Sequence, residues 1–198
     1  TIKRFCNQPK LSQDPKWRAG FDSLEKHELS FDAWFFHHQL DEMVVLAKAY
    51  PNTRFILEHM GTPIGLGGKF ASYGGTDIAR SKTMGLWQEG MAKVAECSNV
   101  SVKLSGFFMP ILGWGYHLRD QPPSLTEIVD DIRPMVEFVI QLFGADRCMF
   151  ASNFPMDKVS MSLEMLYDVY WTLCEGFSDE DKVKLFRDTA RSHYKITD

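Results

Sequence analysis

The sequence lacks the features typical of proteins that bind nucleic acids or span membranes. It has no run of Lys or Arg residues, and its formal net charge is −4 at pH 7. A surface that attracts nucleic acid or anionic lipid is therefore not expected. No apolar stretch approaches the ~18 residues that a transmembrane helix needs. We expect no nucleic-acid partner and no membrane span.

Cysteine is scarce and does not occur in metal-binding or redox spacing. The four cysteines are Cys6, Cys97, Cys148 and Cys174, and no two of them form a CxxC pair. This pattern favours buried free thiols in a reducing compartment. Residues 1–5 resemble no signal peptide and read as a chain entered in the middle of a fold. We therefore expect a cytoplasmic protein.

Nucleotide-binding glycine motifs are missing, although residues 61–82 are rich in glycine. A P-loop would need Gly where Pro63 stands and Ser or Thr where Phe70 stands. The dinucleotide pattern that starts at Gly65 would need a Gly at position 70 as well. We expect this segment to be a flap or a connection with its own turns. The chain has no internal repeat, so residues 1–198 are expected to form one domain.

Strand-like and helix-like segments alternate along the chain. Expected strands cover residues 1–6, 31–38, 54–59, 100–105 and 147–153. Expected helices cover residues 21–27, 40–50, 83–97, 125–143, 160–175 and 179–193, and Ser124 and Ser178 are the expected N-caps of the fourth and the last of them. Long loops follow the strands. This order is typical of βα units in a parallel sheet, and hence of an α/β fold.

Four of these strands end in polar side chains. The strand ends carry His37 and His38, then His59, then Lys103 and Ser105, and finally Ser152 and Asn153. A lone strand-terminal histidine is more often a core residue than a ligand, but here four strands end the same way. Ligands bind at the carboxyl ends of parallel strands, so we expect these groups to meet at one mouth.

The residue types at this mouth restrict its chemistry. Two histidines do not suffice for a catalytic zinc ion, which usually has three protein ligands. A carboxylate at position 153 would supply a base, but the residue is Asn153. An amide does not accept a proton near neutral pH and serves only to orient other groups.

Five motifs in order resemble the amidohydrolase superfamily, specifically its amidohydrolase-2 group of lactonases, related hydrolases and decarboxylases. The motifs are Leu29–Leu40, Phe55–Pro63, Val102–Gly106, Met149–Pro155 and Leu185–Tyr194. Each motif alone is weak. Their order and spacing make the resemblance specific, and it spans essentially the whole chain.

The resemblance implies a (β/α)8 TIM barrel of which this chain holds only a C-terminal portion, about strands four to eight. The strand at 31–38 would be the fifth of the barrel, and residues 1–6 the tail of the fourth. The HxH pair of the family belongs to its first strand and would lie outside the chain. Because five strands cannot close a barrel, we expect another segment to complete it, or a homo-oligomer.

Roles at the mouth also follow from the resemblance. His37 and His59 match the fifth- and sixth-strand histidines, which bind a divalent metal, zinc or manganese, or polarise the substrate carbonyl without a metal. His38 is the weaker candidate, a substrate contact on the opposite face from His37. Asn153 stands where the family has an Asp that acts as general base or metal ligand. Asp157 would substitute for it only if its loop folds back.

Two further residues have alternative roles. Lys103 would bind an anionic substrate or product, or form a buried salt bridge with Glu58. Trp114 would line the substrate pocket, or simply pack its own loop.

The sequence thus predicts a hydrolase of a lactone or similar carboxylic ester, acting on a small molecule through the site of His59 and Asn153. One alternative is a metal-dependent decarboxylase on the same scaffold. The other is a binding protein that lost catalysis when Asn153 replaced the usual Asp.

Overall fold

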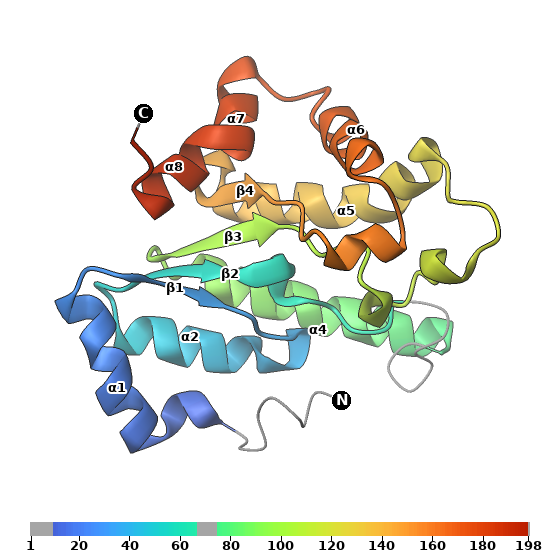
Figure 1. The fold of residues 1–198 in the computed structure, drawn as a ribbon. Helices are drawn as coiled ribbons and strands as arrows, with labels where there is room; N and C mark the ends of the chain where they lie inside the picture. The colour runs from blue at the N-terminus through green and yellow to red at the C-terminus, as the bar shows by residue number, and fades with distance from the viewer. Residues whose placement is uncertain (1–9, 67–74, 198) are drawn as a thin grey trace.

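The computed structural model describes residues 10–66 and 75–197, and its centre is a parallel sheet of four strands in the order β1-β2-β3-β4. The strands are β1 Ser30–Ala33, β2 Arg54–Leu57, β3 Val100–Leu104 and β4 Cys148–Phe150. The predicted parallel α/β architecture is therefore confirmed for these four strands (Figure 1). The strand predicted over residues 1–6 falls outside the described residues.

Helices connect the strands and close the chain. Their bounds are α1 Pro15–Lys26, α2 Leu40–Ala49, α4 Asp77–Ala95, α5 Leu125–Phe143, α6 Leu163–Leu173, α7 Asp179–Val183 and α8 Thr189–Tyr194. A π-helical segment, Lys184–Asp188, joins the last two. Two predicted N-caps are confirmed, because the side chains of Ser124 and Ser178 accept hydrogen bonds from the backbone N–H groups of Glu127 and Asp181.

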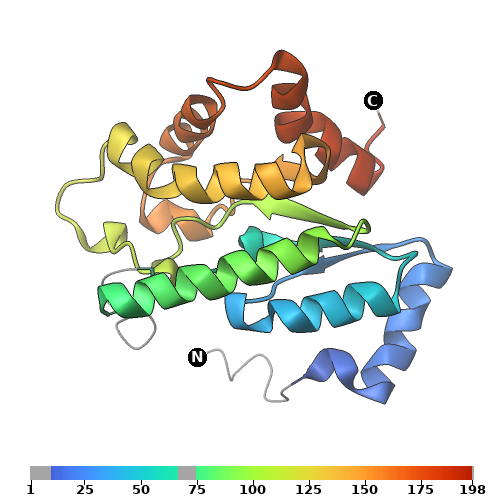
Figure 2. The same cartoon turned by 180° about the vertical axis from the view of Figure 1, so that it is seen from behind.

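One face of the sheet is apolar and packs against α2, α4 and α5, which Figure 2 shows in front of the strands. Alternation along the strands points Phe55 and Leu57 of β2, and Val102 and Leu104 of β3, into this layer. All four are fully buried. Each such side chain contributes roughly 1.5–3 kcal/mol to folding. This layer fixes the strand register, so it also fixes where the strand ends lie.

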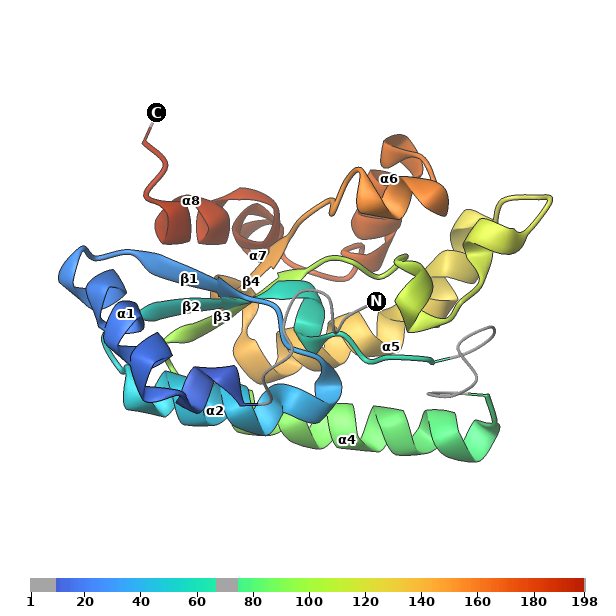
Figure 3. The same ribbon diagram turned by 60° about the horizontal axis from the view of Figure 1, so that its bottom comes forward.

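The opposite face of the sheet carries polar side chains beside the buried Ile56 and Met149. Helix α8 covers it in part, on the other side of the sheet from α2 and α4 (Figure 3). His193 Nε2 lies 2.5 Å from Ser101 Oγ of β3. Tyr194 donates its hydroxyl to Asp32 Oδ2 of β1 at 2.7 Å. The C-terminal helix therefore ties together two strands of the sheet through polar contacts.

Three element boundaries differ from those predicted by more than four residues. The strand expected over 31–38 ends at Ala33, and His37 and His38 lie instead in a 3-10 turn, His37–Gln39. Helix α1 begins at Pro15, inside the expected loop, because Asp14 accepts N–H bonds from its first turn. Helix α4 begins at Asp77 rather than position 83, since Thr76 caps it.

Among the helices that the described residues form, none is long and apolar enough to span a membrane. Cys97, Cys148 and Cys174 are buried free thiols, as predicted. Burial raises the pKa of all three thiols, so they are protonated at neutral pH and unsuited to nucleophilic chemistry.

Candidate functional site at the carboxyl ends of the strands

The four strands point the same way, and the polar groups follow their carboxyl ends, as expected. In Figure 1 the arrowheads lie along one edge of the sheet, and the loops after them gather there. These loops carry His37, His59, Ser105 and Asn153. We refer to this edge as the strand-end site.

His59 sits on a strained turn that directly follows β2. His59 and Met60 have φ angles of 54° and 52°, in the left-handed region that disfavours side chains. Such positions cost about 1–3 kcal/mol each and persist only where the surroundings enforce them. Here the buried indole of Trp87 on α4 donates to the Met60 carbonyl at 2.7 Å. The turn is therefore held from the core, and it aims the imidazole of His59 into the loops.

The imidazole of His59 is fixed on two sides and is neutral at pH 7. Its Nδ1 lies 2.9 Å from Ser105 Oγ, at the end of β3. A Cβ atom on Gly106 would lie 2.6 Å from the same nitrogen, so only glycine allows the β3 loop to come this close. Burial, followed by the charge of Lys103, lowers the pKa of His59 to about 4. A neutral ring can bind a metal or polarise a carbonyl.

His37 is buried in the turn after β1 and has a defined tautomer. The backbone N–H of Ile64 donates to His37 Nδ1 at 3.2 Å. Nδ1 is then unprotonated, so a neutral ring carries its proton on Nε2. Burial also lowers the pKa of His37, which favours that neutral ring. His37 therefore presents an N–H donor through Nε2.

His38 lies apart from this arrangement. It is exposed, and its ring stacks on Phe36 with a centroid distance of 5.9 Å. The neighbouring ring of His37 is nearly perpendicular, at 82°. Beyond this ring contact with His37, no contact in the described structure links His38 to the strand-end residues, and its predicted substrate contact stays a prediction.

Lys103 forms the salt bridge with Glu58 that was one of its two predicted roles. Its Nζ lies 2.5 Å from Glu58 Oε1 and 2.8 Å from Asp32 Oδ2. These hydrogen bonds outweigh the effect of burial and raise the pKa of Lys103. Burial raises the pKa of Glu58, whereas that of Asp32 stays below its usual value because Lys103 and Tyr194 donate to it. Two carboxylates already neutralise this cation.

Asn153 contacts the acid that was predicted to compensate for it. The loop after β4 folds back, and Asn153 Nδ2 donates to Asp157 Oδ1 at 2.9 Å. Asp157 is fully buried. Burial raises its pKa to about 7, although the Asn153 amide and the Phe108 backbone N–H oppose the shift. The loop therefore folds back, which is what the sequence analysis required for Asp157 to substitute for the missing acid.

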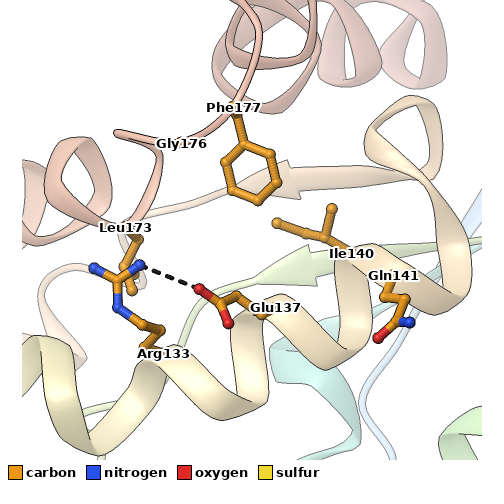
Figure 4. Close-up of a pocket in the computed structure, with 7 residues that line it drawn as sticks. All are labelled: Arg133, Glu137, Ile140, Gln141, Leu173, Gly176 and Phe177. Atoms are coloured by element: carbon orange, nitrogen blue, oxygen red, sulfur yellow. Dashed lines mark hydrogen bonds and ion pairs between the residues drawn. The ribbon is translucent and has the colours of Figure 1, made fainter.

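Trp114 packs on a neighbour within its own loop, and a surface pocket lies on the helical layer. Trp114 stacks on Tyr116 in the β3–α5 loop at a centroid distance of 6.3 Å. A pocket of about 360 Å³ opens between α5 and the segment after α6, where the Arg133–Glu137 ion pair lines it (Figure 4). It is on the helical layer, remote from the strand ends, and contains none of the predicted residues.

Trp34 was missed at the sequence level. Its indole N–H donates to Thr62 Oγ1 at 2.9 Å, and its ring meets that of His59 edge-on at 5.6 Å. The side chain is 53% exposed. Nothing in the sequence separates Trp34 from the apolar run around it. The structure makes it a neighbour of His59.

The residues at this site do not compose a divalent-metal centre. Among residues 10–66 and 75–197, no three His, Cys, Asp or Glu side chains are grouped to hold an ion. His59 fits a ligand role, with Nδ1–H donating to Ser105 and Nε2 binding the metal. His37 does not fit in its present tautomer, because its Nε2 carries the proton. A metal would need ligands beyond these residues.

The chain is similar in sequence to two curated proteins and in structure to a solved amidohydrolase. The chain is 31% identical over 194 residues to the uncharacterized protein y4mH of Sinorhizobium fredii and 25% identical over 188 residues to the L-fucono-1,5-lactonase of Burkholderia ambifaria. It spans 56% of the length of each, so about half of either protein has no counterpart here. The crystal structure of an amidohydrolase from Burkholderia multivorans with bound zinc superimposes with a TM-score of 0.77.

That structure is 20% identical, and the match covers 95% of this chain and 60% of the other. It confirms that the sheet is a portion of a TIM barrel. A family model for amidohydrolases matches residues 2–196, which include all five motifs on which the resemblance was based. The chain therefore belongs to the amidohydrolase family, in its amidohydrolase-2 group.

Proposed function

We propose that this chain supplies the strand-end side chains of a hydrolase that opens lactones or similar carboxylic esters. The observation that carries the proposal is a pair of neutral imidazoles, His37 and His59, that follow neighbouring strands at one edge of the sheet. The L-fucono-1,5-lactonase relative supports a lactone as the substrate class. At 25% identity, this relative does not specify which sugar or which ring size the chain would act on.

The two histidines would act as hydrogen-bond donors to the reacting carbonyl. His37 offers Nε2–H, and His59 offers the same group when Ser105 donates its hydroxyl to Nδ1. Donors placed where negative charge develops are worth about 2.7–4 kcal/mol each in the transition state. Water adds to the carbonyl carbon, the ring C–O bond breaks, and the proton passes to the leaving oxygen. The product is the open hydroxy acid.

The half-exposed indole of Trp34 would form a wall of this site. It lies against His59 and is anchored through Thr62, so its free face is held in place. Aromatic rings pack on the apolar face of a substrate ring while polar groups orient it. Trp34 would therefore contribute to substrate affinity rather than to the chemical step.

A panel of lactones that includes L-fucono-1,5-lactone tests the proposal, measured at neutral pH together with elemental analysis of the purified protein. Hydrolysis without bound metal supports donation by the histidines. Hydrolysis with about one zinc or manganese per chain would show that ligands outside the described residues complete a metal site. Absence of turnover for every lactone would refute the proposal.

The two alternatives are distinguished by the same samples. Release of CO2 from an aromatic acid, with no lactone opened, would favour the decarboxylase. A protein that binds lactones without turning them over, and gains activity as Asn153→Asp, would be a binding protein descended from an enzyme. The predicted homo-oligomer is tested by light scattering, since β1 and β4 are both edges of the described sheet.

A further inference from the structure

In the contact between Asn153 and Asp157, one carboxyl oxygen of Asp157 is buried without a hydrogen-bond partner among the described residues, and a purely structural pair would not need this. Asp157 is 0% exposed, and its Oδ1 accepts the Asn153 Nδ2 hydrogen bond. Its second oxygen, Oδ2, has no hydrogen-bond partner among the described residues. A buried acceptor without a partner costs about 1–3 kcal/mol. An asparagine at position 157 would avoid the cost of burying a carboxylate, so stability alone does not favour an aspartate there.

The loop around this pair is built to hold the carboxyl beneath the amide. Asn153 has a φ of 53°, and its carbonyl accepts N–H bonds from Met156 at 2.8 Å and from Asp157 at 3.3 Å. Ser160 then donates its hydroxyl to the carbonyl of Phe108 at 2.7 Å, which ties the loop to the one after β3. Asp157 therefore has little freedom to turn away from Asn153.

The chemistry of the two groups decides which way the amide faces. A carboxylate only accepts hydrogen bonds, and an amide has one donor end and one acceptor end. We propose that Asp157 is a positioning residue, which holds the NH2 end of Asn153 and so turns its carbonyl oxygen toward the strand-end site. An acceptor oxygen there would orient an O–H of the attacking water. This role rests on the proposed hydrolase function, but the orientation of the amide is a property of the protein alone.

The surroundings of Asp157 make this orientation sensitive to its charge. The groups that face it are the Asn153 amide, the Phe108 backbone N–H and the hydroxyl of Tyr170 on α6, and no salt bridge in the described part of the chain reaches it. Tyr170 is buried, with a pKa raised well above its usual value, so it stays neutral. A protonated Asp157 could donate to the Asn153 oxygen, and the amide would lose its fixed direction.

The experiment follows the side-chain amide of Asn153 by two-dimensional 1H–15N NMR of the protein as a function of pH. Asn153→Ala identifies the signals. We expect them to shift with a midpoint within about one unit of 7, the pKa to which burial raises Asp157. The variant Asp157→Asn should abolish this midpoint. The matched control Asp168→Asn makes the same chemical change on the exposed face of α6 and should leave it unchanged.

Kinetics give the second measurement. Asp157→Asn should lower kcat about tenfold with little change in KM, because the water loses its orientation while the substrate contacts remain. Asn153 amide signals that respond to the titration of no carboxyl group in the wild-type protein overturn the proposal, even if Asp157→Asn fails to fold. So does a titration that survives in Asp157→Asn. Wild-type protein that titrates as expected but opens no lactone would refute the hydrolase function and leave the amide orientation standing.

Discussion

Lys103 bridges two carboxylates on the polar face of the sheet, and the substitution Lys103→Met isolates what that bridge contributes. Its ammonium group lies 2.8 Å from Asp32 Oδ2 and 2.5 Å from Glu58 Oε1. Methionine has a similar reach and no charge. The variant therefore leaves both carboxylates in place without the cation that they share.

The expected loss follows from these distances and from the exposure of the groups. At an effective dielectric constant of ~20, each pair attracts by about 6 kcal/mol before desolvation is counted. Removing one partner of a buried pair costs roughly 3–5 kcal/mol. The side chains of Lys103 and Glu58 are 18% and 17% exposed, but that of Asp32 is 37% exposed. Solvent screening at Asp32 places the loss in unfolding free energy near the lower end, about 3 kcal/mol.

The loss should also depend on pH. Burial raises the pKa of Glu58 already, and without Lys103 it rises further, since the cation favours the charged form. A carboxyl with a folded-state pKa above its unfolded value stabilises the fold at low pH, and this contribution is lost as pH rises through the folded-state pKa. Lys103→Met should therefore destabilise the protein more at about pH 7.5 than at about pH 4.5.

Urea unfolding at both pH values provides the measurement, with Lys93→Met as the control. Lys93 also bridges two carboxylates, at 3.1 Å to Asp41 and 3.0 Å to Glu89, but on an exposed surface. Removing this exposed charge should cost much less stability than removing Lys103. Equal losses of stability in the two variants would contradict this reasoning. So would a loss for Lys103→Met that does not change with pH, because either result would show that burial does not strengthen the ion pairs of Lys103 with Asp32 and Glu58.

Four further substitutions, at three residues, probe the strand-end site. His59→Ala should reduce lactone hydrolysis more than about 100-fold with only a modest loss in urea unfolding, and unchanged activity per folded molecule would make His59 structural. Gly106→Ala forces a Cβ within 2.6 Å of the His59 ring at a φ of +66°, so it should cost about 1–3 kcal/mol of stability and lower kcat. Full activity in Gly106→Ala would show that the ring can move freely. His37→Gln keeps an N–H donor and should retain activity within about tenfold, whereas His37→Ala should lose about 100-fold. Equal activities of the two would argue against donation by His37.

The architecture could be predicted because its signals are local. Alternation in Val100–Leu104 and the serine caps at positions 124 and 178 each need only a few neighbouring residues, and all were confirmed. The start of α4 was missed because Thr76, a residue with its own capping hydrogen bond, overrode the weak periodicity before position 83. The strand at 31–38 was predicted too long because Trp34 and its aromatic neighbours read as a buried strand, while the chain turns after Ala33.

The partners of the site could not be predicted in the same way. The sequence pairs Lys103 with Glu58, but the second carboxylate, Asp32, comes from a strand 71 positions away. Tyr194 reaches the same carboxylate from a sequence separation of 162. Contacts of this kind depend on strand register and on where α8 crosses the sheet, which no local pattern reveals.

The hydrogen bonds at Nδ1 of His37 and His59 determine which ring nitrogen can carry the proton, and the residue type alone does not. The family resemblance predicts that both either bind a divalent metal or polarise the substrate carbonyl. In the folded chain the Ile64 N–H occupies Nδ1 of His37, which leaves its proton on Nε2. For His59 the Ser105 hydroxyl leaves either nitrogen free to carry the proton. Under the proposed function, a metal bound by His59 would still leave His37 as a hydrogen-bond donor, so the two histidines would have separate roles with or without a metal.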